Sequence, residues 1–164
     1  ERHLCEPGAI RSPDGKTIAV LLRENRRVEY SHIIFSKDEG KTWTAPRHMP
    51  ASLCGDRHTG QYLPDGRLFI SFRDVPPRSS SSPTAGDWVA WVGSFNDLLR
   101  NQPGELRIRL KDNHKGADCA YPGVEVLPDG TIVTTTYWHW EERQPPYVLC
   151  VRISPHELAA TAVE

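Results

Sequence analysis

The tripeptide Pro-Asp-Gly occurs three times in the chain, as Pro13-Asp14-Gly15, Pro64-Asp65-Gly66 and Pro128-Asp129-Gly130. An apolar run rich in β-branched and aromatic residues follows each copy, over residues 17–22, 68–72 and 132–136. Such residues favour strands. Because Asp-Gly supplies the positive φ angles that a tight hairpin turn needs, each copy predicts a β-hairpin.

The spacing of the copies predicts a repeated four-stranded unit. The second copy lies 51 residues after the first, and the third lies 64 residues after the second. Propeller blades run about 40–50 residues, and the Pro- and Ser-rich stretch 76–83 accounts for the longer interval as an exposed loop. We therefore expect an all-β chain that forms one propeller segment of about three four-stranded blades, with repeat units near 5–54, 55–117 and 118–164.

Further elements can be placed around the hairpins. Outer strands are expected at 30–35, 88–95 and 147–153, and a short helix at 96–100. A second helix should follow Ser154, because Ser154 and Glu157 have the spacing of a capping box and Pro155 occupies the first helical position. Natural propellers have typically 4–8 blades, so three blades do not close a ring, and two sets of three would form a six-bladed one. Either a missing N-terminal half or a second copy in a homodimer would complete it.

Composition excludes several classes of function. The 20 basic and 21 acidic residues give a net charge of -1, which indicates no nucleic-acid partner. No apolar run reaches the roughly 20 residues that cross a membrane, and no signal peptide is recognisable, although secretion or a periplasmic location stays open. The four cysteines form no C-x-x-C pair, so we expect free thiols, no metal site and no cofactor.

The open ends of the three hairpins carry polar side chains. Residues equidistant from a turn face each other across a hairpin. The predicted pairs are Glu6 with Arg23, His58 with Arg73, and Tyr121 with Trp138, which lies next to Tyr137. In a propeller these ends would converge on one mouth near the axis.

The segment 36–43, Ser-Lys-Asp-Glu-Gly-Lys-Thr-Trp, resembles the Asp-box of sialidases and other repeat propellers. The resemblance implies a structural turn rather than chemistry. Ser36 and Asp38 would bond backbone amides, and Gly40 would free the backbone. Thr42 completes the pattern, and Trp43 would pack between sheets.

Two further stretches resemble the sialidase (neuraminidase) family of six-bladed propellers, and match its C-terminal half. Residues 5–9, Cys-Glu-Pro-Gly-Ala, together with Arg23 resemble the blade that carries a Glu and one arginine of the family's triad. Residues 121–132 resemble the last blade, which opens on the nucleophilic tyrosine. Arg73, within Phe-Arg-Asp, falls where another triad arginine is expected.

The resemblance implies a consistent chemistry. Sialic acid carries a carboxylate on its anomeric carbon, so a neutral phenol suits the nucleophile better than a second carboxylate, and sialidases are the tyrosine exception among glycosidases. Tyr121 would be that nucleophile, and Glu6 its base. Arg23 and Arg73 would bind the substrate carboxylate through bidentate forks, with His58 and Tyr137 as further substrate-binding residues.

Each of these residues also has a structural interpretation. Tyr121 is equally typical of a strand-start aromatic that packs under the next blade. Arg23 and Arg73 could form ion pairs with Glu24 and Asp74, and His58 could stabilise a loop.

Two functions follow from the sequence. The first is a sialidase-like glycoside hydrolase of the exo-α-sialidase type, acting on terminal sialic acid or a related acidic sugar. It would be incomplete, because the family's first triad arginine and its acid/base aspartate belong to an earlier blade, and the isolated chain should be inactive. The alternative is a non-catalytic carbohydrate-binding or structural Asp-box propeller.

Overall fold

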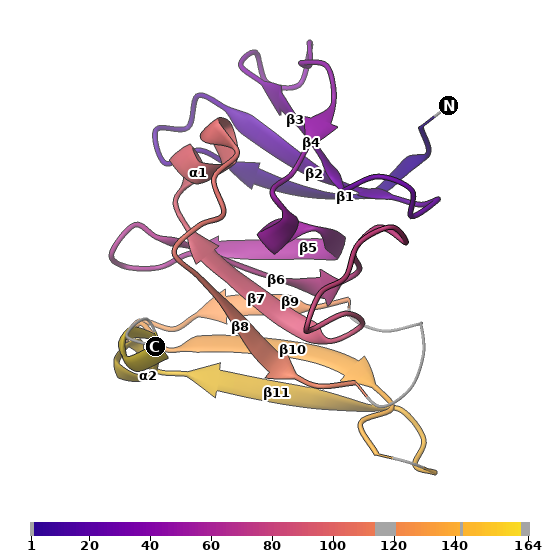
Figure 1. Cartoon of the computed structure of the whole chain (residues 1–164). Helices are drawn as coiled ribbons and strands as arrows, with labels where there is room; N and C mark the ends of the chain where they lie inside the picture. The colour runs from indigo at the N-terminus through magenta and orange to yellow at the C-terminus, as the bar shows by residue number, and fades with distance from the viewer. Residues whose placement is uncertain (1, 114–120, 142, 162–164) are drawn as a thin grey trace.

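The computed structural model describes residues 2–113, 121–141 and 143–161, and these form three antiparallel sheets stacked as layers (Figure 1). The first sheet contains β1 (Leu4–Arg11), β2 (Ile18–Glu24), β3 (His32–Ser36) and β4 (Arg47–His48). The second contains β5 (Gly55–Tyr62), β6 (Leu68–Asp74), β7 (Trp88–Gly93) and β8 (Leu106–Lys111). The third contains β9 (Gly123–Val126), β10 (Ile132–Trp138) and β11 (Tyr147–Ile153).

Each sheet is a simple up-and-down meander, and the first strands of the three sheets are neighbours. β1 contacts β5, and β5 contacts β9, so the sheets share an inner edge like the blades of a propeller. The predicted all-β, propeller-type fold is confirmed. Among the described residues the third sheet has three strands rather than the expected four.

The second sheet lies between the other two and is buried on both faces (Figure 1). In β6 the even positions Leu68, Ile70 and Phe72 pack into the cluster shared with the first sheet. Phe69 packs into the cluster shared with the third sheet, against Ile132. Because side chains alternate across a strand, one continuous apolar run supplies both cores.

Short helices lie at the ends of the sheets. η1 (Ala51–Leu53) precedes β5, α1 (Phe95–Arg100) follows β7, and α2 (Pro155–Thr161) follows β11. The predicted capping box is confirmed. The Ser154 amide donates to Glu157 at 2.8 Å, and the Glu157 amide donates to the Ser154 hydroxyl at 3.2 Å. None of the described helices is long and apolar enough to cross a membrane.

The three Pro-Asp-Gly turns have nearly the same geometry. The glycines have positive φ angles of 75°, 88° and 84° at Gly15, Gly66 and Gly130. Each aspartate accepts a hydrogen bond from the amide two residues ahead, at 2.9–3.1 Å. The prediction that both Asp and Gly take positive φ is wrong, since only the glycines do. The second and third turns are therefore three-residue loops with the glycine last.

β-bulges change the register at the open ends. In β1 the pairing shifts between Cys5 and Gly8, which places Cys5 opposite Arg23. In β5 it shifts between Asp56 and Thr59, which places Asp56 opposite Arg73. Glu6 and His58 are therefore not the direct partners that equal spacing predicted. In the third hairpin Gly123 pairs with Thr135, and the same register carried outward puts Tyr121 across from Tyr137 instead of Trp138.

The 36–43 segment forms a closed polar turn after β3. The Ser36 hydroxyl accepts from the Gly40 amide at 2.9 Å, and Asp38 accepts from the Thr42 amide at 2.9 Å and from its hydroxyl at 2.6 Å. Gly40 has φ 81°. Trp43 does not pack between sheets as expected. It is 41% exposed, and its indole donates to the Gly40 carbonyl at 3.0 Å.

Gly8 tests how tightly the first sheet packs on the second. A Cβ there would lie 2.2 Å from the His58 carbonyl oxygen, which is backbone and cannot rotate away. Gly8→Ala should lower the free energy of unfolding by about 1–3 kcal/mol or more in urea denaturation. Gly123→Ala is the control, because its Cβ would meet only the Thr135 side chain at 3.2 Å. Equal effects of the two substitutions would contradict the close approach of β1 and β5.

Candidate functional site: an arginine–carboxylate cluster

Asp56 is the centre of an ion-pair cluster at the open ends of the first two hairpins. Its side chain is fully buried. Arg27 binds it with both terminal nitrogens, at 2.6 Å and 2.7 Å. Arg73 donates a further hydrogen bond to Oδ2, and the Arg23 Nε lies 3.6 Å from Oδ1. One carboxylate therefore holds three guanidinium groups.

The electrostatics of Asp56 follow from these contacts. Burial alone would raise the pKa of its carboxyl, but the hydrogen bonds from Arg27 and Arg73 outweigh burial and lower the pKa below its usual value. Asp56 is thus ionised at neutral pH, as a carboxylate that accepts from charged donors should be.

The turn between β2 and β3 places Arg27 for this contact. The Glu24 carboxylate accepts hydrogen bonds from the Arg26 and Val28 amides, each at 3.0 Å. Arg27 takes a left-handed conformation with φ 60°, and its guanidinium also donates to the Glu24 carbonyl at 3.2 Å. The expected Arg23–Glu24 ion pair is therefore wrong, because Glu24 serves the backbone of the turn.

Glu6 and Arg57 occupy matching positions in the bulges of β1 and β5. Both have positive φ angles, 49° and 60°, which cost a non-glycine residue roughly 1–2 kcal/mol. The Glu6 carboxylate lies 2.8 Å from the Arg23 Nη1 and 3.4 Å from the Arg57 Nε. The two bulges thus turn side chains of opposite charge toward each other.

Tyr121 lies at the exposed side of the cluster. Its side chain is 58% exposed. The Arg57 guanidinium carbon lies 3.8 Å from the centre of its ring, a cation–π contact. The Tyr137 ring stacks on it with centroids 6.3 Å apart and planes 14° apart. Arg57 therefore connects Glu6 to Tyr121, and no direct Glu6–Tyr121 hydrogen bond occurs in the described part of the chain.

The structure brings most of the predicted site residues into one network. They are Glu6, Arg23, Arg73, Tyr121 and Tyr137, joined through Asp56 and Arg57. Arg73 pairs with Asp56 rather than with the neighbouring Asp74, which instead binds Arg107 at 2.8 Å. The Arg73 side chain is only 7% exposed.

His58 does not belong to this network, and its prediction as a substrate-binding residue is wrong. It is 4% exposed, its ring stacks on Phe72 at 4.9 Å, and its Nε2 lies 2.9 Å from the Leu53 carbonyl. Burial lowers its pKa to about 4. A neutral, enclosed imidazole of this kind supports the loop before β5.

Three charged residues of the cluster were not predicted: Arg27, Asp56 and Arg57. Asp56 and Arg57 directly precede His58 in the sequence, but equal spacing across the hairpin selected His58 instead. Only the bulge places Asp56 opposite Arg73. Arg27 lies in a turn between strands, where the sequence shows an Arg-Arg pair and no periodicity.

Comparison with known proteins supports the fold and leaves the family open. No family model matches the sequence, and no curated protein is detectably similar to it. Among solved structures, a protein of unknown function from Dyadobacter fermentans matches 94% of the chain at 18% identity, with a TM-score of 0.73. The match covers 39% of that protein.

Two intramolecular trans-sialidases are also similar. The leech enzyme, solved with 2,7-anhydro-Neu5Ac, aligns over 94% of this chain and 24% of its own length, with 18% identity and a TM-score of 0.65. The Ruminococcus gnavus enzyme, solved with oseltamivir carboxylate, aligns over 93% and 33%, with 17% identity and a TM-score of 0.63. The chain thus has the fold of propeller glycoside hydrolases and spans about a quarter to two fifths of these three proteins.

Asp56 should contribute more to stability than any surface carboxylate. Asp56→Asn leaves the buried Arg73 and the half-buried Arg27 without their counter-charge, and breaking a buried pair costs about 3–5 kcal/mol. Chemical denaturation at pH 7 measures the loss. Because the pKa is lowered in the folded state, the stabilisation is present above the usual pKa of an aspartate and is lost as the pH falls below it. The free energy of unfolding of Asp56→Asn should therefore fall less steeply than that of the wild type as the pH is lowered through this range. Glu39→Gln, in the exposed pair with Arg11, should have a much smaller effect.

His58 should make the protein less stable in mild acid. The unfolded chain protonates this imidazole near pH 6.5, whereas the folded chain does so only near pH 4. Stability is therefore full above about pH 6.5 and falls by up to roughly 3 kcal/mol as the pH drops to 4. His58→Gln should flatten this part of the stability–pH curve, and His156→Gln, at an exposed helical position, should leave it unchanged. Equal slopes in all three proteins would mean that His58 is accessible to protons.

Proposed function

We propose that this chain carries part of the active site of a sialidase-like glycoside hydrolase, which removes terminal sialic acid or a related acidic sugar. The observation that carries the proposal is the gathering of arginines beside an exposed tyrosine at the shared end of the hairpins. The fold, which trans-sialidases share, is compatible with this role but does not decide it.

The charge of the cluster suits an anionic ligand. Four arginines, Arg23, Arg27, Arg57 and Arg73, are gathered around the two carboxylates of Glu6 and Asp56. A substrate carboxylate could join the partly exposed arginine of this set, Arg23, because guanidinium forks bind carboxylates bidentately.

The partners of the arginines suggest two roles. The Arg23 side chain contacts Glu6, and the two side chains are 18% and 25% exposed, so Arg23 can reach a ligand that displaces Glu6. Arg27 and Arg73 are committed to Asp56. In this proposal Arg23 binds the substrate carboxylate, and Asp56 with its two arginines positions it.

Tyr121 is the proposed nucleophile and Glu6 its general base. A substrate carboxylate bound to Arg23 and Arg57 would compete with Glu6 for both guanidinium groups and free a Glu6 oxygen. That oxygen would accept the Tyr121 proton as the phenolic oxygen attacks the anomeric carbon and the glycosidic bond breaks. Tyr137 would fix the Tyr121 ring by stacking. The acid that protonates the leaving group would come from blades outside this chain or from a second copy.

A non-catalytic, sugar-binding propeller is the second candidate. It is favoured by the contact of Arg57 with both Glu6 and the Tyr121 ring, which keeps the base and the nucleophile apart. In that case the cluster would bind an acidic sugar or stabilise the fold without turnover.

Binding and turnover should separate in solution. In an NMR titration the chain should bind N-acetylneuraminic acid more tightly than the neutral sugar galactose. Arg23→Ala should weaken binding at least tenfold, Arg23→Lys should recover part of it, and Tyr121→Phe should change it little. Equal binding of both sugars by the wild type would contradict an anion site.

Hydrolysis of a fluorogenic sialoside by the isolated chain should be undetectable, because leaving-group protonation contributes about 10²–10⁴-fold. Turnover that Tyr121→Phe abolishes would show that the chain holds the complete machinery, contrary to this proposal. Selective binding of the acid with no turnover, even after blades or copies that complete the ring are supplied, would favour the binding module.

A further inference from the structure

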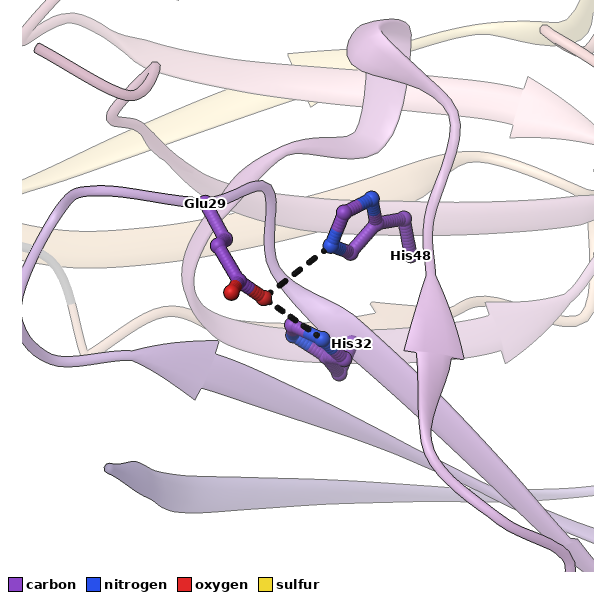
Figure 2. Close-up of side chains that lie close together, drawn as sticks. All are labelled: Glu29, His32 and His48. Atoms are coloured by element: carbon purple, nitrogen blue, oxygen red, sulfur yellow. Dashed lines mark hydrogen bonds and ion pairs between the residues drawn. The ribbon is translucent and has the colours of Figure 1, made fainter. Parts of the chain in front are cut away.

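Glu29, His32 and His48 meet at the outer edge of the first sheet, apart from the arginine cluster (Figure 2). We propose that these three side chains bind a divalent transition-metal ion, with Zn²⁺ as the ion that fits the donor set. The proposal does not depend on the function of the arginine cluster.

The backbone places the two histidines side by side. His32 in β3 is the direct cross-strand partner of His48 in β4, so both side chains project from the same face of the sheet. Glu29 lies three residues before His32, in the turn that leads into β3. Figure 2 shows the carboxylate of Glu29 turned toward both rings.

The distances between donor atoms approach those of a tetrahedral site. The Glu29 Oε2 lies 3.1 Å from the His48 Nε2 and 3.4 Å from the His32 Nε2. One donor atom from each residue lies within 4.8 Å of the others. Zinc–nitrogen and zinc–oxygen bonds near 2.0–2.1 Å require donors about 3.3 Å apart in a tetrahedron. Both distances from Glu29 are close to this spacing, and the two imidazole nitrogens, which lie within 4.8 Å of each other, would move to the same spacing when an ion binds.

His32 provides an independent sign of a ligand. Its side chain is fully buried, and among the residues that the structure describes neither ring nitrogen makes a hydrogen bond, since the Nε2 has only the 3.4 Å ion-pair contact with Glu29. Buried polar groups without a partner are uncommon. Burial, followed by the charge of His48, lowers the pKa of His32, so its imidazole is neutral at pH 7 and offers a lone pair. A metal ion on Nε2 would satisfy the nitrogen that faces Glu29.

Glu29 and His48 leave the site open to solvent. Their side chains are 36% and 48% exposed, so an ion can enter from water. Hydrogen bonds with His48 and Arg2 lower the pKa of Glu29, which keeps it ionised. Arg2 binds the same oxygen at 3.2 Å through a side chain that is 54% exposed, and it competes with a cation for that oxygen.

The donor set selects the kind of ion. Two imidazoles and one carboxylate suit zinc and its neighbours, whereas Ca²⁺ and Mg²⁺ prefer oxygen ligands alone. Three protein ligands leave one coordination position for water.

Calorimetric titration of the metal-stripped chain with ZnCl₂ tests the proposal. Every protein in this experiment carries the substitution Cys150→Ser, because Cys150 is an exposed thiol and thiolates also bind zinc. We expect one equivalent to bind with a micromolar or lower dissociation constant. His48→Ala and Glu29→Gln should each weaken binding at least tenfold, and His156→Ala, the matched control on α2, should not.

A second variant should change the affinity for zinc in the opposite direction. Arg2→Ala removes the competing cation and should tighten zinc binding several-fold, with MgCl₂ and CaCl₂ still binding weakly. Zinc should also raise the melting temperature of the wild type and not that of His48→Ala. No zinc binding at micromolar concentration, or binding that His48→Ala and Glu29→Gln leave unchanged, would overturn the proposal.

Discussion

The ion pairs of the buried Asp56 carboxylate are the interactions on which the arrangement of side chains at the open ends of the first two hairpins depends. It lies at the start of β5 in the second sheet, yet two of its arginines, Arg23 and Arg27, belong to the first sheet and its β2–β3 turn. Its third partner, Arg73, comes from the adjacent strand β6. A single ionised group therefore ties two blades together and fixes three side chains. Apolar packing joins the same sheets elsewhere, but it does not fix the orientation of a guanidinium group as a hydrogen-bonded carboxylate does. A buried pair of this kind is costly to desolvate and costly to break, which makes it a source of specific geometry.

The bulges in β1 and β5 extend that geometry to the surface. Each places a non-glycine residue, Glu6 or Arg57, at positive φ, and each shifts the register so that a different residue faces the arginine of the next strand. The conformational cost is offset where the two bulged side chains meet as an ion pair. Bulges commonly re-aim side chains beside active sites. The repetition of the same device in two successive blades explains why the open ends of the hairpins, and not the Pro-Asp-Gly ends, present the chemically able groups.

Local signals in the sequence were enough to predict the hairpins and α2 with its capping box, because turn chemistry and strand alternation act over a few residues. The convergence of Glu6, Arg23, Arg73 and Tyr121 was predicted only by combining the hairpins with the expected propeller arrangement. Details set by distant contacts could not be predicted. Equal spacing across a hairpin cannot detect a bulge, so His58 was placed at the mouth although it is buried against Phe72. The pairing of His32 with His48 depends on β4, a strand of two residues, which carries no periodic pattern. Trp43 is partly exposed because its indole bonds within its own turn.

The carboxylate that each arginine contacts determines which arginines are available to bind an anionic ligand. Asp56 occupies both terminal nitrogens of Arg27 and one of Arg73, whereas Arg23 and Arg57 contact Glu6, which is itself partly exposed. In the proposed mechanism, an anion that binds Arg23 and Arg57 would therefore compete with Glu6 rather than with Asp56. That displacement would cost part of the binding energy, but in the proposed mechanism it would free a carboxylate oxygen for Tyr121 when the substrate binds, which is when a base is needed. In a pure binding module the same exchange would only weaken affinity, and a neutral partner for the arginines would serve better. Under the proposed mechanism, an exchange of Glu6 from arginine to tyrosine would thus be the physical step that separates a catalytic cluster from a sugar-binding one.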